Sequence, residues 1–270
     1  MEASQAPAVN IKACIFDVDG TLLDTESLSD LAILRALRLP PGVKELTQNQ
    51  IPWELKSHIL GLPSYGGVGG GSGWSPVVLR FFKEVGGWDG RRGGREYTAS
   101  KLWGDWEMQM NELLEECRVC RGAAMLVNEL EAREMPLGIA TSSGGEGWSI
   151  KMQKHANLFD KFTVIVTGDD PSILHGKPAP DMYLSASDRL GVRPEECLVF
   201  EDSKAGCASA ISAGCHVVAV PDRRCDKTDF WEMGCEEVLG SLEEFKGEKW
   251  GLDVDIRRMV GERKRRSRRG

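Results

Sequence analysis

The sequence predicts an α/β fold: a doubly wound, mostly parallel sheet with a small α-helical domain inserted into it. Three observations support this class. Short apolar runs alternate with helical stretches, the alternation stops between about residues 28 and 120, and helical patterns separated by glycine-rich runs fill that interval. With 270 residues, of which 41% are hydrophobic, the chain can bury one sizeable core and a small second domain.

Five apolar runs are expected to form the strands. Each is apolar throughout instead of alternating in polarity, which is typical of strands buried on both faces of a parallel sheet. Cys14 and Cys197 lie inside two of the runs and are expected to act there as small hydrophobic residues. The five runs are residues 11–16, 137–141, 163–166, 197–200 and 217–220.

Three helices are predicted between these strands, over residues 122–135, 181–190 and 204–213. Gly191 and Gly214 directly follow the last two, at the position where a glycine commonly ends a helix. Strands that alternate with helices in this way indicate βαβ units and hence a parallel sheet.

The inserted domain is expected to be helical, with helices over residues 28–39, 76–85 and 98–117. Apolar side chains at steps of three or four residues predict a core-facing side on the last helix: Leu102, Trp106, Met110, Leu113 and Cys117. The glycine-rich runs 61–73 and 86–94 are expected to lack regular structure. The predicted organisation is a core of residues 1–27 and 120–256, a helical insertion of residues 28–119, and a basic, disordered tail over residues 257–270.

The formal charge of −7 hides a strong asymmetry. Residues 257–270 hold eight Arg or Lys and one Glu, a net +7, so that residues 1–256 carry −14. An acidic body repels a phosphate backbone, and nucleic acid is therefore not expected as the main partner. The basic tail is interpreted as a solvated end, with nuclear import and binding to an anionic surface as open alternatives.

No apolar run approaches ~18 residues, so a membrane-spanning helix is not expected. The first ten residues lack the basic and apolar regions of a secretory signal, which predicts a cytoplasmic protein with reduced thiols. Cys117 and Cys120 form a single C-x-x-C pair, and no zinc site is expected from it. A monomer is the default expectation.

Acidic residues follow two of the predicted strands. Asp17 and Asp19 come directly after the first strand, before a turn expected at Gly20, and Glu201 and Asp202 follow the fourth strand in the same way. Mg²⁺ prefers one or two carboxylates together with phosphate oxygens and water. The alternative interpretation of each pair is a solvated strand end or a helix cap.

Two further segments add hydroxyl groups and a cation. Thr141 and Ser142 end the second strand and precede glycines, and such hydroxyl and backbone N–H groups can hold phosphate oxygens. Lys177 lies beside Pro178 and close to Pro180, which restrict the backbone around its ammonium group. Each segment alone fits an ordinary turn. Because the carboxyl ends of parallel strands meet at one edge of a sheet, all four segments are expected to converge.

Taken together, these segments resemble the motif set of the haloacid dehalogenase superfamily of phosphotransferases, over residues 11–30 and 120–252. The resemblance implies a Rossmann-like core with a helical cap inserted after the first motif. Within the superfamily, the chain is most similar to the branch that contains pseudouridine-5′-phosphatase and glycerol-phosphate phosphatases. Residues 24–26, 168–171, 175–178, 220–222 and 249–252 carry this finer likeness.

The resemblance also implies a role for each site residue. Asp17 would be the nucleophile that forms an aspartyl-phosphate, and Asp19 the general acid and base. Lys177 would supply a catalytic positive charge, while Thr141 and Ser142 would bind phosphoryl oxygens. The implied Mg²⁺ ligands are Asp17, the backbone carbonyl of Asp19, and Asp202, with Glu201 orienting water or joining the shell.

The implied function is Mg²⁺-dependent hydrolysis of a small phosphorylated metabolite. Candidates are a nucleotide-like phosphomonoester such as pseudouridine 5′-phosphate, or glycerol or sugar phosphate. One alternative is a phosphosugar mutase of the same fold, although the related mutase has a His ten positions after its acid/base Asp and this chain has Ser29 there. Another is a non-enzymatic regulator that uses the basic tail. The cap departs from the family pattern at Leu62 and Pro63, where a cation is common, and in the glycines of residues 66–73.

Overall fold

The computed structural model describes residues 10–38, 51–59 and 73–267. It divides the chain into two compact units, one made of Met1–Leu23 and Arg118–Gly270, the other of Asp24–Cys117. The predicted departures at Leu62, Pro63 and the glycines up to residue 72 lie outside the described residues.

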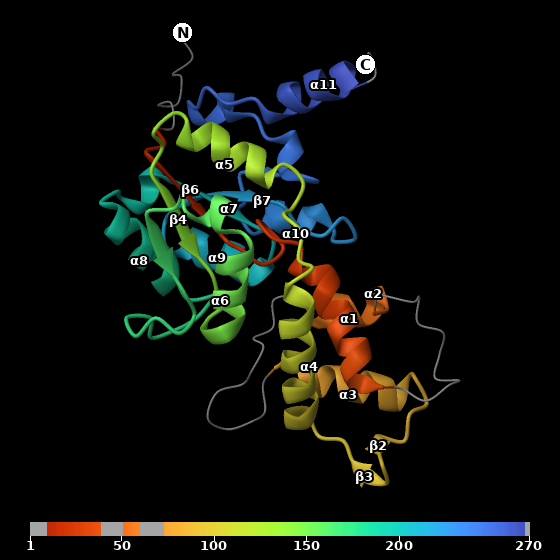
Figure 1. The fold of residues 1–270 in the computed structure, drawn as a ribbon. Helices are drawn as coiled ribbons and strands as arrows, with labels where there is room; N and C mark the ends of the chain where they lie inside the picture. The colour runs from red at the N-terminus through yellow and green to blue at the C-terminus, as the bar shows by residue number, and fades with distance from the viewer. Residues whose placement is uncertain (1–9, 39–50, 60–72, 268–270) are drawn as a thin grey trace. The chain divides into compact units, whose positions relative to one another are not determined.

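A six-stranded parallel sheet forms the centre of the first unit, in the order β5-β4-β1-β6-β7-β8 (Figure 1). The chain therefore adds strands on one side of β1, returns, and adds strands on the other side, which confirms the predicted doubly wound α/β class. The strands are β1 (Ala13–Phe16), β4 (Leu137–Ala140), β5 (Val164–Val166), β6 (Cys197–Glu201), β7 (His216–Ala219) and β8 (Glu237–Val238). The first five correspond to the predicted runs, while β8 was missed because it has only two residues and begins with a charged one.

Alternate residues of the strands pack on opposite faces of the sheet, as the pleat requires. On one face, Ile15 and Val199 share a buried cluster with side chains of two helices, among them Tyr183 and Cys207. On the other face, the ring of Phe16 stacks on that of Phe200, with centroids 4.6 Å apart. Burial on both faces explains why the strands read as continuous apolar runs, and Cys14 and Cys197 are fully buried as expected.

Each described helix of this unit except the last precedes a strand of the sheet, and the last helix follows the final strand. Ser203 caps one of them, since its side chain accepts a hydrogen bond from the N–H of Gly206, and Gly191 ends another with a positive φ of 68°. The helices are α5 (Ala123–Glu131), α6 (Gly145–Lys154), α7 (Ala156–Phe159), α8 (Asp181–Leu190), α9 (Lys204–Ser212), α10 (Lys227–Glu232) and α11 (Ile256–Ser267), with short 3-10 turns at Pro194–Glu196, Leu242–Glu244 and Gly247–Trp250.

Helix α11 corrects the prediction of a disordered tail for residues 257–267, and the last three residues lie outside the described part of the chain. Ile256 is fully buried and anchors its first turn, and arginine and lysine are good helix formers. Lys264, Arg265 and Arg266 lie in the last turn, where cations interact favourably with the helix dipole. The six cations of α11 remain exposed to solvent, so the segment is solvated but helical.

The second unit contains four helices among its described residues: α1 (Thr25–Leu37), α2 (Trp53–Ile59), α3 (Trp74–Glu84) and α4 (Ala99–Leu114). Their apolar faces meet in a separate core that includes Val78, Phe82 and Leu102. The expectation that residues 86–94 lack regular structure was wrong at one point, because β2 (Arg91–Arg92) pairs with β3 (Arg95–Glu96) in an antiparallel hairpin. Gly93 and Gly94 join them with φ of 59° and 77°, the conformation that a two-residue hairpin turn needs.

Among the described residues, none of the helices has the length and apolar character that crossing a bilayer requires.

Candidate active site

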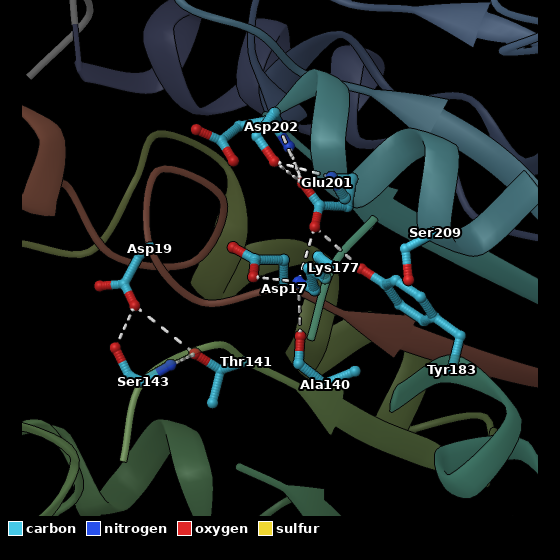
Figure 2. Close-up of polar contacts among 12 residues, drawn as sticks. Asp17, Asp19, Ala140, Thr141, Ser143, Lys177, Tyr183, Glu201, Asp202 and Ser209 are labelled. Atoms are coloured by element: carbon cyan, nitrogen blue, oxygen red, sulfur yellow. Dashed lines mark hydrogen bonds and ion pairs between the residues drawn. The ribbon is translucent and has the colours of Figure 1, made fainter. Parts of the chain in front are cut away.

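The four polar segments meet at the carboxyl edge of the central strands (Figure 2). Strand β1 lies between β4 and β6, and its last residue, Phe16, is in register with Ile139 and Phe200. The residues that follow these three positions must therefore emerge side by side. The backbone N–H of Asp17 still donates to the carbonyl of Phe200 over 3.0 Å, which fixes the first site residue to the sheet.

Asp17 is a buried carboxylate with two different oxygens. Its Oδ1 accepts a hydrogen bond from Lys177 Nζ over 2.7 Å, whereas its Oδ2 is buried and has no hydrogen-bond partner. Burial, together with the nearby charges of Glu201 and Asp19 and against the opposing effect of Lys177, raises the pKa of Asp17 to about 8. The unpartnered oxygen is costly in this position unless it binds a cation or reacts.

Lys177 is held by three acceptors and has almost no contact with solvent. Its ammonium group donates to Asp17 Oδ1 over 2.7 Å, to Glu201 Oε1 over 2.7 Å and to the carbonyl of Ala140 over 2.9 Å. Burial lowers the pKa of Lys177, but the charges of Asp17 and Glu201 outweigh it and keep the pKa above its ordinary value. Lys177 is therefore a fixed positive charge, in the centre of Figure 2.

Glu201 is fully buried and accepts five hydrogen bonds. Its Oε1 accepts from Lys177 and, over 3.0 Å, from the Tyr183 hydroxyl. Its Oε2 accepts from the backbone N–H of Asp202 at 2.9 Å and from the N–H and hydroxyl of Ser203 at 3.0 and 3.1 Å. A carboxylate has about four lone-pair sites, so five donors leave little capacity for a cation. The geometry therefore makes Glu201 the anchor of Lys177.

A glycine in helix α9 is needed for this arrangement. A Cβ atom on Gly206 would lie 1.6 Å from Glu201 Oε1, which no side chain can tolerate. A second close approach occurs at Gly20, where φ is +88° and a Cβ would lie 2.0 Å from Asp202 Oδ2. The turn after Asp19 thus packs directly against the Asp202 carboxylate.

An acidic cluster at this edge fits a divalent cation. Ligand oxygens of Asp17, Glu201 and Asp202 all lie within 4.8 Å of one another. Carboxylate oxygens are the donors that Mg²⁺ and Ca²⁺ take. Since Glu201 is already saturated by donors, Asp17 and Asp202 are the side chains that fit a cation.

Asp19 points to a different set of partners. Its Oδ2 accepts from the Ser143 hydroxyl over 2.6 Å and more weakly from Thr141 Oγ1 over 3.5 Å. Its Oδ1 accepts from Lys151 Nζ over 2.5 Å. Figure 2 shows Asp19 turned toward Thr141 and Ser143, with Asp17 turned toward Lys177. The two carboxylates of the first motif therefore lie in separate polar environments.

The hydroxyl groups differ from expectation in one respect. Thr141 is fully buried, and its Oγ1 accepts from the backbone N–H of Ser143 over 3.1 Å. Ser142 is exposed, and the serine hydroxyl that reaches Asp19 belongs to Ser143. The phosphate-binding role of Ser142 stays a prediction. The sequence interpretation gave Ser143 no role because side-chain direction at a strand end depends on the turn that follows, which the residue types leave open.

Lys151 and Tyr183 were missed by the sequence interpretation. Lys151 lies on helix α6, which was not predicted because residues 144–147 include three glycines and glycine has a low helix propensity. Tyr183 lies on α8 and reads as an ordinary core residue of an amphipathic helix. Its hydroxyl is the only hint that a buried polar partner is needed.

Comparisons with known proteins find relatives that match most of the chain. A protein of Drosophila melanogaster named probable pseudouridine-5′-phosphatase is 36% identical over 248 residues, which are 88% of this chain and 93% of the relative. The (DL)-glycerol-3-phosphatase 1, mitochondrial, of Arabidopsis thaliana is 31% identical over 246 residues, covering 90% of this chain and 74% of the relative.

Solved structures show the same fold at lower identity. A family IA, variant 3 HAD hydrolase from Entamoeba histolytica superposes with a TM-score of 0.65 at 23% identity, covering 89% of this chain and 97% of the other. A family model described as haloacid dehalogenase-like hydrolase matches residues 11–214. The motif order, the doubly wound sheet and this match lead to one conclusion: the chain belongs to the haloacid dehalogenase-like hydrolase family.

Proposed function

We propose that this hydrolase cleaves small phosphomonoesters in a Mg²⁺-dependent reaction that passes through an aspartyl-phosphate on Asp17. The observation that carries the proposal is the state of the Asp17 carboxylate, with Lys177 on one oxygen and a buried, unpartnered second oxygen. The two curated relatives named above are both named as phosphatases, which supports the reaction class.

In the first half-reaction, Asp17 Oδ2 attacks phosphorus in line with the leaving oxygen. The new O–P bond forms as the bond to the leaving group breaks, and the leaving oxygen takes a proton from Asp19. Lys177 balances the charge that a phosphate dianion brings next to Asp17. Thr141 and the backbone N–H groups after it, with Ser142, would hold the phosphoryl oxygens.

In the second half-reaction, Asp19 takes a proton from a water molecule whose oxygen attacks phosphorus. The bond between phosphorus and Asp17 breaks, which restores the carboxylate and releases inorganic phosphate. Uncatalysed hydrolysis of phosphate monoesters is among the slowest reactions known, and enzymes accelerate it by up to ~10²¹-fold. Division into two steps replaces this one difficult reaction by two easier ones.

Asp17, Asp202 and the backbone carbonyl of Asp19 would hold the Mg²⁺ ion. When bound, the ion supplies positive charge that offsets repulsion between the carboxylates and the phosphate oxygens. Because five hydrogen-bond donors already occupy the oxygens of Glu201, its role would be to hold Lys177 and not to bind the ion. Asp19 would act through its backbone carbonyl because its carboxylate is engaged by Ser143 and Lys151.

The first substrates to test are pseudouridine 5′-phosphate and glycerol 3-phosphate, because relatives at 36% and 31% identity are named for these activities. The cellular location proposed from the sequence is the cytoplasm. A small phosphorylated metabolite is the proposed partner, and the alternative of a sugar-phosphate mutase predicts a different product from the same substrate class.

The test is phosphate release from about fifty phosphorylated metabolites by the purified protein in Mg²⁺. We expect release from at least one monoester, loss of activity in EDTA, and recovery when Mg²⁺ is restored. Full activity without a divalent metal would contradict the proposed metal site. Isomer formation from a sugar 1-phosphate would favour a mutase, and no release from any monoester would favour a non-enzymatic regulator.

A further inference from the structure

Helix α6 contributes a buried lysine to the site. Lys151 is 4% exposed, and its Nζ donates to Asp19 Oδ1 over 2.5 Å and to Ser143 Oγ over 2.7 Å. The Ser143 hydroxyl donates in turn to Asp19 Oδ2 over 2.6 Å. The three side chains form a closed triangle in which both oxygens of Asp19 are held by separate donors.

The triangle is built on rigid elements. The backbone N–H of Ser143 donates to the hydroxyl of the fully buried Thr141, directly after strand β4. Helix α6 begins two residues after Ser143, at Gly145, and places Lys151 about two turns further on. Lys154, on the same helix, is exposed. Of these two lysines only Lys151 is buried. A buried ammonium group needs an oppositely charged partner, which indicates that Lys151 is held by a specific ion pair.

Asp19 needs such a partner because of its surroundings. It lies two residues after Asp17, so that two carboxyl groups lie close together at one edge of the sheet. Lys177 is occupied by Asp17, Glu201 and the Ala140 carbonyl. Once Asp19 has given its proton to the leaving group it carries a negative charge, which the ammonium group of Lys151 in contact with it balances.

We propose that Lys151 is a positioning residue: together with Ser143 it fixes the orientation of the Asp19 carboxylate for proton transfer to the leaving group. The inference rests on the proposed function, in which Asp19 protonates the leaving oxygen. Because each oxygen of Asp19 accepts a hydrogen bond from a different donor, the carboxyl group cannot rotate freely about its Cβ–Cγ bond. Misplacement of a catalytic group by about 1 Å can cost about a hundredfold in rate.

Positioning of Asp19 by Lys151 predicts a dependence on the leaving group, which a role of Lys151 in stability alone does not predict. An alkoxide leaving group needs a proton as its bond to phosphorus breaks, whereas p-nitrophenolate is stable enough to leave without one. Loss of Lys151 should therefore slow cleavage of an alkyl phosphate much more than cleavage of p-nitrophenyl phosphate. The parameter to compare is kcat/KM, which covers only the steps up to formation of the phosphorylated enzyme.

The experiment compares Lys151→Met with the wild type and with the matched control Lys154→Met on the exposed side of α6. We expect Lys151→Met to lower kcat/KM for the best alkyl phosphate by about a hundredfold, within the range for lost general acid catalysis, and for p-nitrophenyl phosphate by less than about threefold. Lys154→Met should match the wild type on both substrates. Lys151→Arg should recover part of the alkyl phosphate activity.

Two further variants separate this role from a loss of folding or of substrate binding. Ser143→Ala should show the same selectivity in weaker form, and Lys151→Met added to Asp19→Asn should have no further effect on alkyl phosphate cleavage. Equal losses on both substrates, or additive losses in the double variant, would overturn the positioning role. A wild type that cleaves neither substrate would refute the proposed function, whereas an active wild type with no selective loss refutes only the inference on Lys151.

Discussion

At the scale of single residues, the buried charges of the site lie in direct contact with groups of opposite charge. Lys177 is shared by Asp17 and Glu201, and Lys151 contacts Asp19. A buried ion without a partner costs several kcal/mol, so each of these pairs is required by burial itself. The result is two adjacent polar environments in which the carboxylates of one short motif can take different roles.

Tyr183 lies outside the four polar segments, and its hydrogen bond to Glu201 can be tested by a single substitution. Burial raises the pKa of its hydroxyl well above the ordinary value, as does the charge of Glu201, so the hydroxyl remains a donor. Tyr183→Phe keeps the ring and removes one donor from a buried carboxylate. We expect a loss of about 1.5 kcal/mol in the free energy of unfolding, measured by urea denaturation.

The same variant should keep most of its activity, since Lys177 still holds the same oxygen of Glu201. We expect kcat to fall by less than about twofold. Unchanged stability would mean that the hydrogen bond between Tyr183 and Glu201 contributes nothing, and the description of Glu201 as a saturated anchor would then be wrong.

At the scale of elements, the hairpin of the second unit is joined to its helices by one carboxylate. Asp105 on α4 accepts from the Tyr97 hydroxyl at 2.6 Å, from Arg92 Nη1 at 2.7 Å and from Lys101 Nζ at 2.6 Å. Tyr97 and Arg92 also contact the carbonyl of Ala36, near the end of α1. This network explains how two strands of two residues each can form.

Partial burial raises the pKa of Asp105, but hydrogen bonds from Lys101 and Tyr97 outweigh it and leave the pKa below its ordinary value. A carboxyl with a lowered folded-state pKa stabilises the fold above its unfolded pKa of about 3.9, and this contribution is lost as the pH falls through the folded value. We predict that Asp105→Asn lowers unfolding stability by about 2 kcal/mol at neutral pH.

The difference between wild type and Asp105→Asn should shrink as the pH falls below about 4, because the wild-type carboxyl then becomes neutral as well. Thermal unfolding followed by tryptophan fluorescence at neutral pH and at about pH 3 measures both values. A difference that stays constant with pH would show that the ionised form of Asp105 is not what joins the hairpin to α4.

Prediction from sequence succeeded where one physical signal dominates an element. The five buried strands are continuous apolar runs, and helix α8 has a glycine directly after its last residue. Helix α6 begins among glycines, and β2 and β3 are short and charged, so their formation depends on contacts such as those of Lys151 and Asp105 that appear only in the folded chain. Helix α11 was missed because its high charge was read as disorder.

At the scale of the whole molecule, the order of the strands accounts for the site. Strand β1 carries the first acidic motif and lies between β4 and β6, where the direction of strand addition reverses. Ligands of open α/β sheets bind outside the carboxyl ends at such a reversal. This explains why residues as far apart as Asp17 and Lys177 could be assigned to one site from sequence, while Ser143 and Lys151 could not.

The account depends most on Asp17 as the group that becomes phosphorylated. The measurement is mass spectrometry of peptides from Asp19→Asn protein quenched during reaction with p-nitrophenyl phosphate and Mg²⁺, because this variant lacks the proposed base for release of phosphate. The account predicts a phosphoryl group on the peptide that contains Asp17, and a loss of at least ~10³-fold in kcat for Asp17→Asn with its fold retained. A phosphoryl group on another residue, or an Asp17→Asn protein that still turns over, would contradict it.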